Sequence, residues 1–170
     1  RDETDTGWKG RGKQSLAPGG MFYTAQSGIW QSVWMEWVPE TYIERIEITP
    51  EYDTASLKVR VFFNRPDAGL VKKITVRERE AADAKVICIR ETKADEAELI
   101  LGSFTSWSPE CPHLYGISVE AGDDRIESYF GMRKFGVGKD EKGITRLFLN
   151  GKPYFQNGIL DQGYWPESLY

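Results

Sequence analysis

The chain has 170 residues, 40% of them hydrophobic, which is enough for one globular domain with attached ends. Its net charge of −4 argues against nucleic acid and anionic membranes as partners, because proteins that bind them usually carry a basic face. No apolar run approaches the roughly 18 residues needed to span a bilayer.

The first twenty residues contain five glycines and one proline that break any periodicity, so we expect no strand in them. The sequence Gly-Arg-Gly-Lys at residues 10–13 lacks the strand, helix and spacing of a phosphate-binding loop. We therefore expect a surface loop there and predict no cofactor.

A dense group of tryptophans follows, with Trp30, Trp34 and Trp37 in a predicted strand over residues 30–38. One interpretation is that these rings pack in a core or against a neighbouring domain. The other is that they form a stacking platform for sugars, for which Trp107 is a further candidate. The composition favours packing.

The central element is predicted over residues 57–63, where Leu-Lys-Val-Arg-Val-Phe-Phe alternates between apolar and charged side chains. This period is typical of a half-buried antiparallel strand, whose apolar face requires a second sheet to cover it. Similar patterns predict strands over residues 42–49, 70–79, 86–90, 98–101, 114–120 and 125–130. With turn signals between them and no convincing helix, these strands predict an all-β sandwich.

Tyr115 opens the penultimate strand of this sandwich after a proline-rich loop, as in the tyrosine corner of immunoglobulin-like folds. No cysteine follows two residues later, so an antibody-type domain with its disulfide between the sheets is not expected.

The two cysteines, Cys88 and Cys111, have a spacing that fits no metal site. One disulfide is arithmetically available, but we expect two free thiols, because Cys88 lies in an apolar run typical of a buried strand. The single histidine, His113, has no cysteine or carboxylate pattern near it and is expected to be structural. No metal site is predicted.

Residues 131–145 are rich in glycine and charge, and we expect an exposed connector. Asn150-Gly151 between two apolar runs is a strong signal for a two-residue hairpin turn, in which both residues need a positive φ. A new strand is predicted from residue 157. It runs into an aromatic loop and the sequence stops at Tyr170, which favours a chain cut from a larger protein.

Four segments carry more specific sequence motifs. The first two are residues 27–36 (Ser-Gly-Ile-Trp-Gln-Ser-Val-Trp-Met-Glu) and 107–115 (Trp-Ser-Pro-Glu-Cys-Pro-His-Leu-Tyr). The other two are residues 129–135 (Tyr-Phe-Gly-Met-Arg-Lys-Phe) and 149–161 (Leu-Asn-Gly-Lys-Pro-Tyr-Phe-Gln-Asn-Gly-Ile-Leu-Asp). In this order they resemble segments of glycoside hydrolase family 2, the group of β-galactosidases, β-glucuronidases and β-mannosidases. The resembling parts are the last jelly-roll strand, the corner and the exit of the immunoglobulin-like domain, and the entry to the catalytic barrel.

The resemblance implies an all-β, immunoglobulin-like antiparallel β-sandwich over residues 38–135. Residues 1–37 would be the C-terminal tail of a sugar-binding jelly roll. Residues 136–170 would be a linker, a hairpin and the first strand of a truncated (β/α)8 barrel.

The family's chemistry is retaining hydrolysis, with one carboxylate as acid and base and a second as nucleophile. The resemblance places both glutamates on later barrel strands, so we expect no catalytic residue and no hydrolysis in this chain. Barrel active sites form at the C-terminal ends of strands, so Asp161, Gln162 and Trp165 would lie near the parent enzyme's substrate, contacting sugar hydroxyls and stacking on a ring. Packing within a loop is the alternative for these residues.

These features are compatible with three functions. The first is a non-catalytic scaffold segment of a retaining β-glycosidase, of β-galactosidase type. The second is a stand-alone carbohydrate-binding module using surface tryptophans, and a weaker third is an adhesion-type domain. The first function is favoured, because a self-contained module would not begin within a jelly roll and end within a barrel strand. An adhesion-type domain would also have no reason to carry the barrel-entry motif.

As partners, the resemblance implies the neighbouring jelly-roll and barrel domains of the parent chain and the parent's carbohydrate substrate. Apolar residues near the C-terminus, including Ile159 and Leu160, could also promote self-association. No signal peptide is visible, and the compartment stays open, with periplasmic and secreted locations both compatible with the family.

Overall fold

The computed structural model describes residues 13–26, 28–29, 31–65, 69–79, 81 and 83–161. The chain divides into two compact units, one formed by Trp37–Gln156 and the other by Arg1–Glu36 with Asn157–Tyr170. In the second unit, β1 (Gln14–Ser15) pairs in parallel with β2 (Tyr23–Thr24), a short element in a stretch where we expected none.

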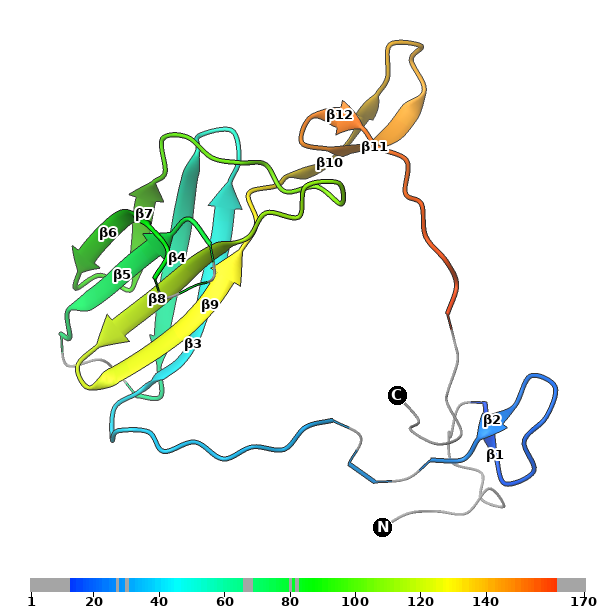
Figure 1. Ribbon diagram of the computed structural model, residues 1–170, viewed down its shortest axis with the longest axis horizontal. Helices are drawn as coiled ribbons and strands as arrows, with labels where there is room; N and C mark the ends of the chain where they lie inside the picture. The colour runs from blue at the N-terminus through cyan, green and yellow to red at the C-terminus, as the bar shows by residue number, and fades with distance from the viewer. Residues whose placement is uncertain are drawn as a thin grey trace. The chain divides into compact units, whose positions relative to one another are not determined.

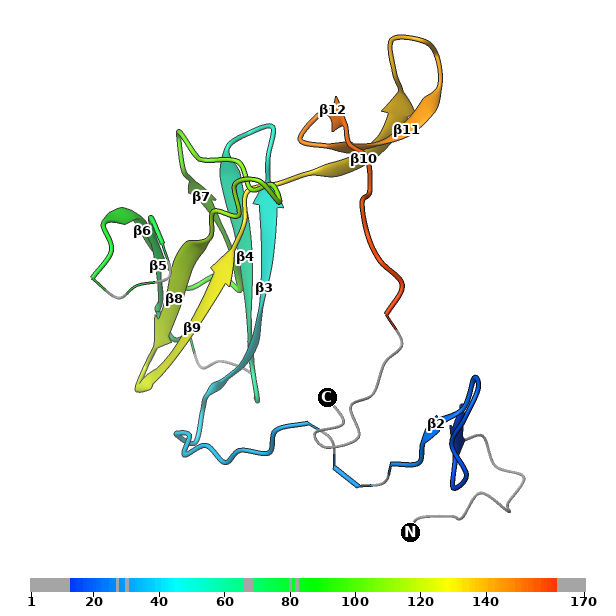
Figure 2. The same cartoon turned by 45° about the vertical axis from the view of Figure 1, so that its right-hand side comes forward.

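The unit of residues 37–156 contains a two-layer β-sandwich. Its strands are β3 (Ile43–Glu51), β4 (Ser56–Phe63), β5 (Lys72–Arg77), β6 (Val86–Thr92), β7 (Glu96–Ile100), β8 (Tyr115–Ala121) and β9 (Asp124–Phe130). One sheet has the order β3-β4-β7 and the other β6-β5-β8-β9, with every pair antiparallel. Figure 1 shows the strands along the chain, and Figure 2 shows the two layers more nearly edge-on.

The core lies between these sheets and follows the predicted alternation. Leu57, Val59 and Val61 of β4 are buried, while Lys58 and Arg60 are exposed on the opposite face. The facing sheet contributes buried residues such as Ile74 and Val119. The prediction of an all-β sandwich with β4 at its centre is therefore confirmed, and its architecture is consistent with an immunoglobulin-like domain.

One charged side chain lies in this apolar core. Lys72, the first residue of β5, is fully buried, and its Nζ donates to the backbone carbonyl of Lys93 at 2.9 Å. The same Nζ lies 3.5 Å from a carboxylate oxygen of Asp95 and 5.4 Å from the centre of the Phe63 ring. These contacts compensate the charge, because a buried ammonium group needs hydrogen bonds and counter-charge to be tolerated.

A three-stranded hairpin follows the sandwich, with the order β10 (Phe135–Lys139), β11 (Thr145–Leu149) and β12 (Lys152–Pro153). Its last turn has φ of 53° at Asn150 and 79° at Gly151, which confirms the predicted turn. The expected connector over residues 131–145 is only partly correct, since β10 pairs with β11. The ring of Phe148 lies over Gly138, where an added Cβ would be 3.3 Å from it, so the aromatic side chain covers a glycine-rich strand.

Two predicted strands are absent from the described residues. Residues 31–38 are extended without a ladder, and residues 154–161 form no strand. A strand needs a neighbour to satisfy its backbone groups, and the described residues offer neither segment a partner. The jelly-roll and barrel pieces predicted for the two ends remain predictions.

Candidate functional site

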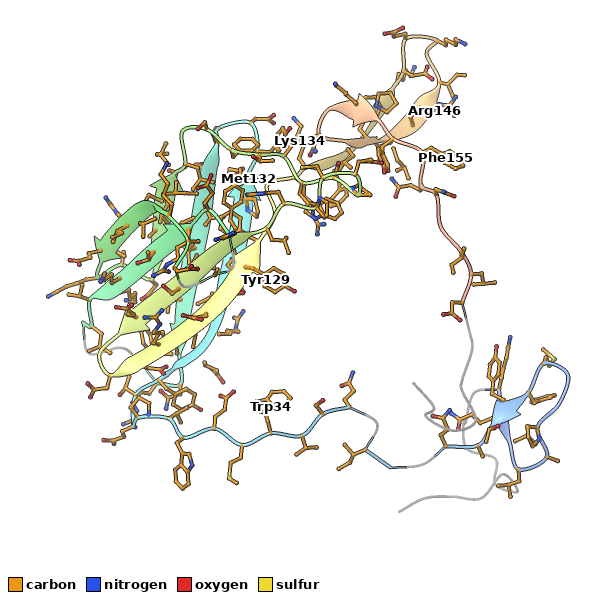
Figure 3. The ribbon with its side chains drawn as sticks, viewed as in Figure 1. Trp34, Tyr129, Met132, Lys134, Arg146 and Phe155 are labelled. Atoms are coloured by element: carbon orange, nitrogen blue, oxygen red, sulfur yellow. The ribbon has the colours of Figure 1, made fainter. Side chains whose placement is uncertain are left out.

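The site that the structure builds most fully is the corner where the chain leaves the sandwich. The loop between β7 and β8 meets the segment that follows β9 through a parallel bridge between Ser106 and Met132. The Trp107 amide donates to the Met132 carbonyl at 2.9 Å, and Met132 is fully buried. Figure 3 labels Met132 and Lys134 on this exit segment. We call residues 103–113 and 131–134 the exit corner.

Trp107 is held in the exit corner by two neighbours. A Cβ added to Gly131 would lie 3.1 Å from three atoms of Trp107, so a larger residue there would push the Trp107 side chain away by a few tenths of an ångström. The Arg133 guanidinium lies 4.3 Å from the centre of the Trp107 ring and 5.2 Å from that of Phe135. A cation this close to an aromatic face is attracted by the ring, so a neighbouring side chain already uses the ring of Trp107.

Tyr115 fixes the other end of the same loop. Its hydroxyl accepts a hydrogen bond from the Thr105 amide at 2.7 Å, and its ring stacks on Phe130 with 5.4 Å between ring centres. A hydroxyl that bonds back to an upstream backbone amide at the start of this strand is the feature of a tyrosine corner, as predicted. His113 packs edge-on against Tyr115, as expected for a structural residue.

Tyr115→Phe is expected to lower the free energy of unfolding by about 1–3 kcal/mol, because the Thr105 amide would lose its acceptor while the ring packing remains. Urea denaturation followed by circular dichroism measures this loss. Tyr154→Phe is the control, since it removes a hydroxyl from an exposed contact. Equal losses for the two variants would contradict the role of the Tyr115 hydroxyl.

The hairpin is attached to the exit corner mainly through Asn150. Its side-chain Oδ1 accepts from the backbone amide of Lys134 at 3.1 Å, and its backbone amide donates to the Lys134 carbonyl at 2.9 Å. Its Nδ2 donates to the Trp107 carbonyl at 2.9 Å. One side chain therefore joins the turn after β11, the exit segment and the β7–β8 loop.

Two polar contacts supplement this attachment. The Lys134 ammonium binds both carboxylate oxygens of Asp53, at 2.6 and 2.7 Å, and lies 6.0 Å from the centre of the Tyr52 ring. The Tyr154 hydroxyl donates to Glu110 at 2.7 Å. The first contact links the exit segment to the β3–β4 turn, and the second links the chain after β12 to the β7–β8 loop.

The Glu110–Tyr154 contact gives the hairpin a pH dependence. The hydrogen bond from Tyr154 lowers the pKa of Glu110, and the backbone amide of Glu110 and the Ser108 side chain lower it further. The stabilisation that the ionised Glu110 carboxylate gives is therefore lost as the pH falls through this lowered pKa. The same bond, followed by burial, raises the pKa of Tyr154, so the contact is lost again as the pH rises through that raised value. The contact therefore contributes between the two values.

Tyr154→Phe is expected to move the titration midpoint of Glu110 upward toward that of an ordinary glutamate, because the first cause of its lowered pKa is removed. Carboxyl ¹³C NMR of the wild type and the variant measures the midpoint. Ser108→Ala serves as the comparison, since it removes a smaller contribution at the same carboxylate. An unchanged midpoint in Tyr154→Phe would contradict the contact.

An open groove runs beside the exit corner, between the sandwich edges. Its volume is about 570 Å³, and its lining includes Pro50, Trp107, Tyr129, Arg133 and Phe135. Aromatic surface with one cation suits contact with another part of a protein as well as contact with a sugar ring.

The sequence-predicted sugar-contact residues differ in how far they are exposed. Trp34 and Trp37 expose 74% and 96% of their surface, and the Trp34 indole donates to Glu36 at 2.9 Å. Figure 3 shows Trp34 projecting from its extended segment. Trp107 is half-buried in the exit corner, and Asp161 is exposed. Trp30, Gln162 and Trp165 lie outside the described residues, and all these roles stay predictions.

The prediction of two free thiols is confirmed for Cys88 and Cys111. Burial raises the pKa of the Cys88 thiol, whereas Cys111 is exposed. In the part of the chain that the structure describes, no three His, Cys, Asp or Glu side chains converge on a metal-sized site. The described residues also contain no helix of the length and hydrophobicity that crossing a membrane requires.

Sequence reasoning missed the parts of the exit corner that act through side chains. The Asn150-Gly151 signal predicted the turn, but it gave no indication that the side-chain amide of Asn150 would bond to the backbone carbonyl of Trp107. Arg133 lies in the segment 129–135 that resembles the family, but that segment did not predict its contact with Trp107, because the ring lies 26 positions earlier in the sequence.

Comparison with known proteins places the exit corner in a family context. Residues 41–133 match the family model described as "Glycosyl hydrolases family 2". The chain is 27% identical over 152 residues to the β-galactosidase large subunit of Latilactobacillus sakei, which covers 83% of this chain and 23% of that protein. It is 27% identical over 156 residues to the β-galactosidase of Lactococcus lactis subsp. lactis (strain IL1403), covering 85% and 14%.

Among solved structures, this chain is similar in fold to parts of β-glucuronidases. A Faecalibacterium prausnitzii β-glucuronidase superposes with a TM-score of 0.54 and 26% identity, over 68% of this chain and 17% of that one. An uncultured Clostridium sp. β-glucuronidase has a TM-score of 0.54 at 21% identity, which shows the fold alone. The chain spans less than a quarter of the length of each of these four relatives.

Proposed function

Since the chain belongs to glycosyl hydrolases family 2, we propose that it is the non-catalytic scaffold segment of a retaining β-glycosidase. In this role the sandwich is a rigid spacer, and the exit corner fixes the direction in which the chain continues toward the catalytic domain. The observation that carries the proposal is a set of bonds around the exit corner. Asn150 and Tyr154 attach the hairpin to the β7–β8 loop, and Lys134 attaches the exit segment to Asp53. A flexible linker between independent modules would have no need of such bonds.

The burial pattern supports a spacer more than a ligand-binding module. The side chains of the exit corner are engaged with one another, with Arg133 on Trp107 and Asn150 on the Trp107 carbonyl. Exposed apolar side chains instead lie on the hairpin, at Phe135, Val137 and Leu147. Such a face suits contact with a further part of a protein.

The rigid-spacer role is tested by ¹⁵N relaxation of this chain. We expect amides of β11 and amides of β4 to report one common rotational correlation time, because the hairpin and the sandwich tumble together. Asn150→Asp removes the Nδ2 donor while keeping Oδ1, and should begin to separate the two values. Independent tumbling of the hairpin in the wild type would overturn the spacer role.

We propose a β-galactoside as the substrate of the parent enzyme, supported by the two β-galactosidase relatives at 27% identity. Nitrophenyl β-galactoside, β-glucuronide and β-mannoside distinguish the candidate sugars. This chain should hydrolyse none of them, whereas the longest natural form of the protein should show its highest kcat/KM with the galactoside. A preference for the glucuronide would overturn the assignment of the sugar, and hydrolysis by the 170 residues would overturn the non-catalytic role.

The same chain can be examined for glycan binding by its tryptophans. With neutral β-galactosides and β-mannosides, a scaffold should show no saturable change in tryptophan fluorescence. A saturable change that disappears in Trp34→Ala or Trp37→Ala, with Trp107→Phe as the comparison, would replace the scaffold with a binding module.

A further inference from the structure

A second polar site lies on the outer face of the sheet β6-β5-β8-β9, away from the core. The ladder places Arg77 of β5 opposite Gly116 of β8, and Gly116 opposite Tyr129 of β9. Because Gly116 has no side chain, it forms the floor of a groove of about 200 Å³ between the arginine and the tyrosine. Tyr129 is 58% exposed, and Figure 3 shows its side chain standing out from β9.

The groove contains two cations that have no ion-pair partner among the described residues. These are Arg77 and Arg79, which both line it. The Arg77 Nη1 donates to the Ser118 hydroxyl at 3.0 Å, which ties the guanidinium to the strand that carries Gly116. Its Nε is buried and has no acceptor in the described part of the chain. A buried donor without an acceptor is rare, and it marks a place where an acceptor fits.

The acidic residue that lines this groove does not neutralise these arginines. Glu127 lies opposite Ser118 in the ladder, and its Oε1 accepts from Arg125 at 2.6 Å. Arg125 also binds Glu120, so these three residues form their own charged cluster on the neighbouring row. No carboxylate in the described part of the chain therefore neutralises Arg77 or Arg79, and their positive charge can serve a ligand.

We propose that this groove binds a small oxyanion, a carboxylate or phosphate group, carried on a molecule no larger than about one sugar ring. A guanidinium binds such groups through paired N–H donors, and the orphaned Nε supplies one of them. The Tyr129 ring offers an apolar face for the rest of the ligand. The volume of about 200 Å³ is below the range of roughly 300–1,000 Å³ that is typical of drug-sized ligands, so only a small molecule fits. This site is independent of the scaffold role.

The test is an NMR titration of the intact chain that follows the Arg77 Nε–H and the amides of Gly116 and Ser118. The probes are sodium phosphate, sodium acetate and galacturonate, with sodium chloride at equal ionic strength and neutral galactose as controls. We expect saturable shifts with at least one oxyanion and none with chloride or galactose. Phosphate alone, or the carboxylates alone, would identify the kind of oxyanion, and tighter binding of galacturonate than of acetate would assign a role to Tyr129.

Arg77→Gln is expected to weaken binding by about tenfold or more, because a charge-assisted hydrogen bond is lost. Arg90→Gln is the matched control, because it makes the same change of charge away from the groove. Arg90 of β6 pairs with Ile74, which faces the core, so Arg90 lies on the opposite face of the sheet from Arg77. Arg77→Lys keeps the charge but removes the fork, and Arg79→Gln provides a second variant should Arg77→Gln fail to fold. Shifts that chloride reproduces, or that persist unchanged in every folded Arg77 and Arg79 variant, would overturn the proposal.

Discussion

Replacing Asn150 with alanine is expected to open the hairpin without unfolding the sandwich. The change removes the acceptor of the Lys134 amide and the donor to the Trp107 carbonyl. It also places an alanine at a φ of 53°, a left-handed conformation that asparagine tolerates better. Together these losses amount to about 2–4 kcal/mol in the free energy of opening.

Amide hydrogen exchange measures this effect directly. Exchange at Leu147 and Leu149 in β11 should become about 30- to 1,000-fold faster, since every 1.4 kcal/mol is a factor of ten. Exchange at Val59 in β4 should remain unchanged. Asn150→Gly is the matched control, because it loses the same amide group without the backbone strain, and its effect should be smaller. Equal exchange rates in β11 of Asn150→Ala and the wild type would mean that Asn150 does not hold the hairpin.

Leu57→Ala is expected to remove about 2–5 kcal/mol from the free energy of unfolding of the sandwich. Leu57 has no exposed surface and lies in β4, between Pro50 of β3 and Leu99 of β7. Its truncation leaves a cavity at the centre of the three-stranded sheet, where neighbours on both sides limit collapse. Such a loss is a large part of the roughly 5–15 kcal/mol that stabilises a typical domain.

Urea denaturation gives the loss for Leu57→Ala. The control is Ile100→Ala in β7, which also truncates an aliphatic side chain but at a position that is 63% exposed. Its expected cost is below about 1 kcal/mol, because little buried surface is lost. If both variants unfold at the same urea concentration, β4 is not the centre of the core.

The fold could be predicted because its strands carry their information locally. Alternation in residues 57–63 identified which side chains of β4 are buried, and Asn150-Gly151 identified the hairpin turn. The position of Tyr115 after its proline-rich loop predicted a tyrosine corner, and its hydroxyl does accept from a backbone amide, that of Thr105. In each case the period or the φ requirement of a few adjacent residues was sufficient.

The failures occurred where a partner far away in the sequence decides the structure. The apolar residues 31–38 form no strand among the described residues, because a strand also requires a neighbour to pair with. The glycine-rich β10 is a strand because β11 pairs with it and Phe148 covers Gly138. The burial of Lys72, for which the sequence offered no prediction, likewise depends on the Lys93 carbonyl and Asp95, which meet its ammonium group.

By itself, the sequence determined the all-β sandwich, its central strand, the hairpin turn and the resemblance to a glycosidase family. Only the tertiary structure decided that Asn150 joins the hairpin to the exit corner and that Gly116 lies between Arg77 and Tyr129 in the sheet. The physical reason is the range of the interactions. Strand period and turn geometry depend on neighbours in the chain, whereas hydrogen bonds and cation contacts depend on residues that only folding brings within a few ångströms.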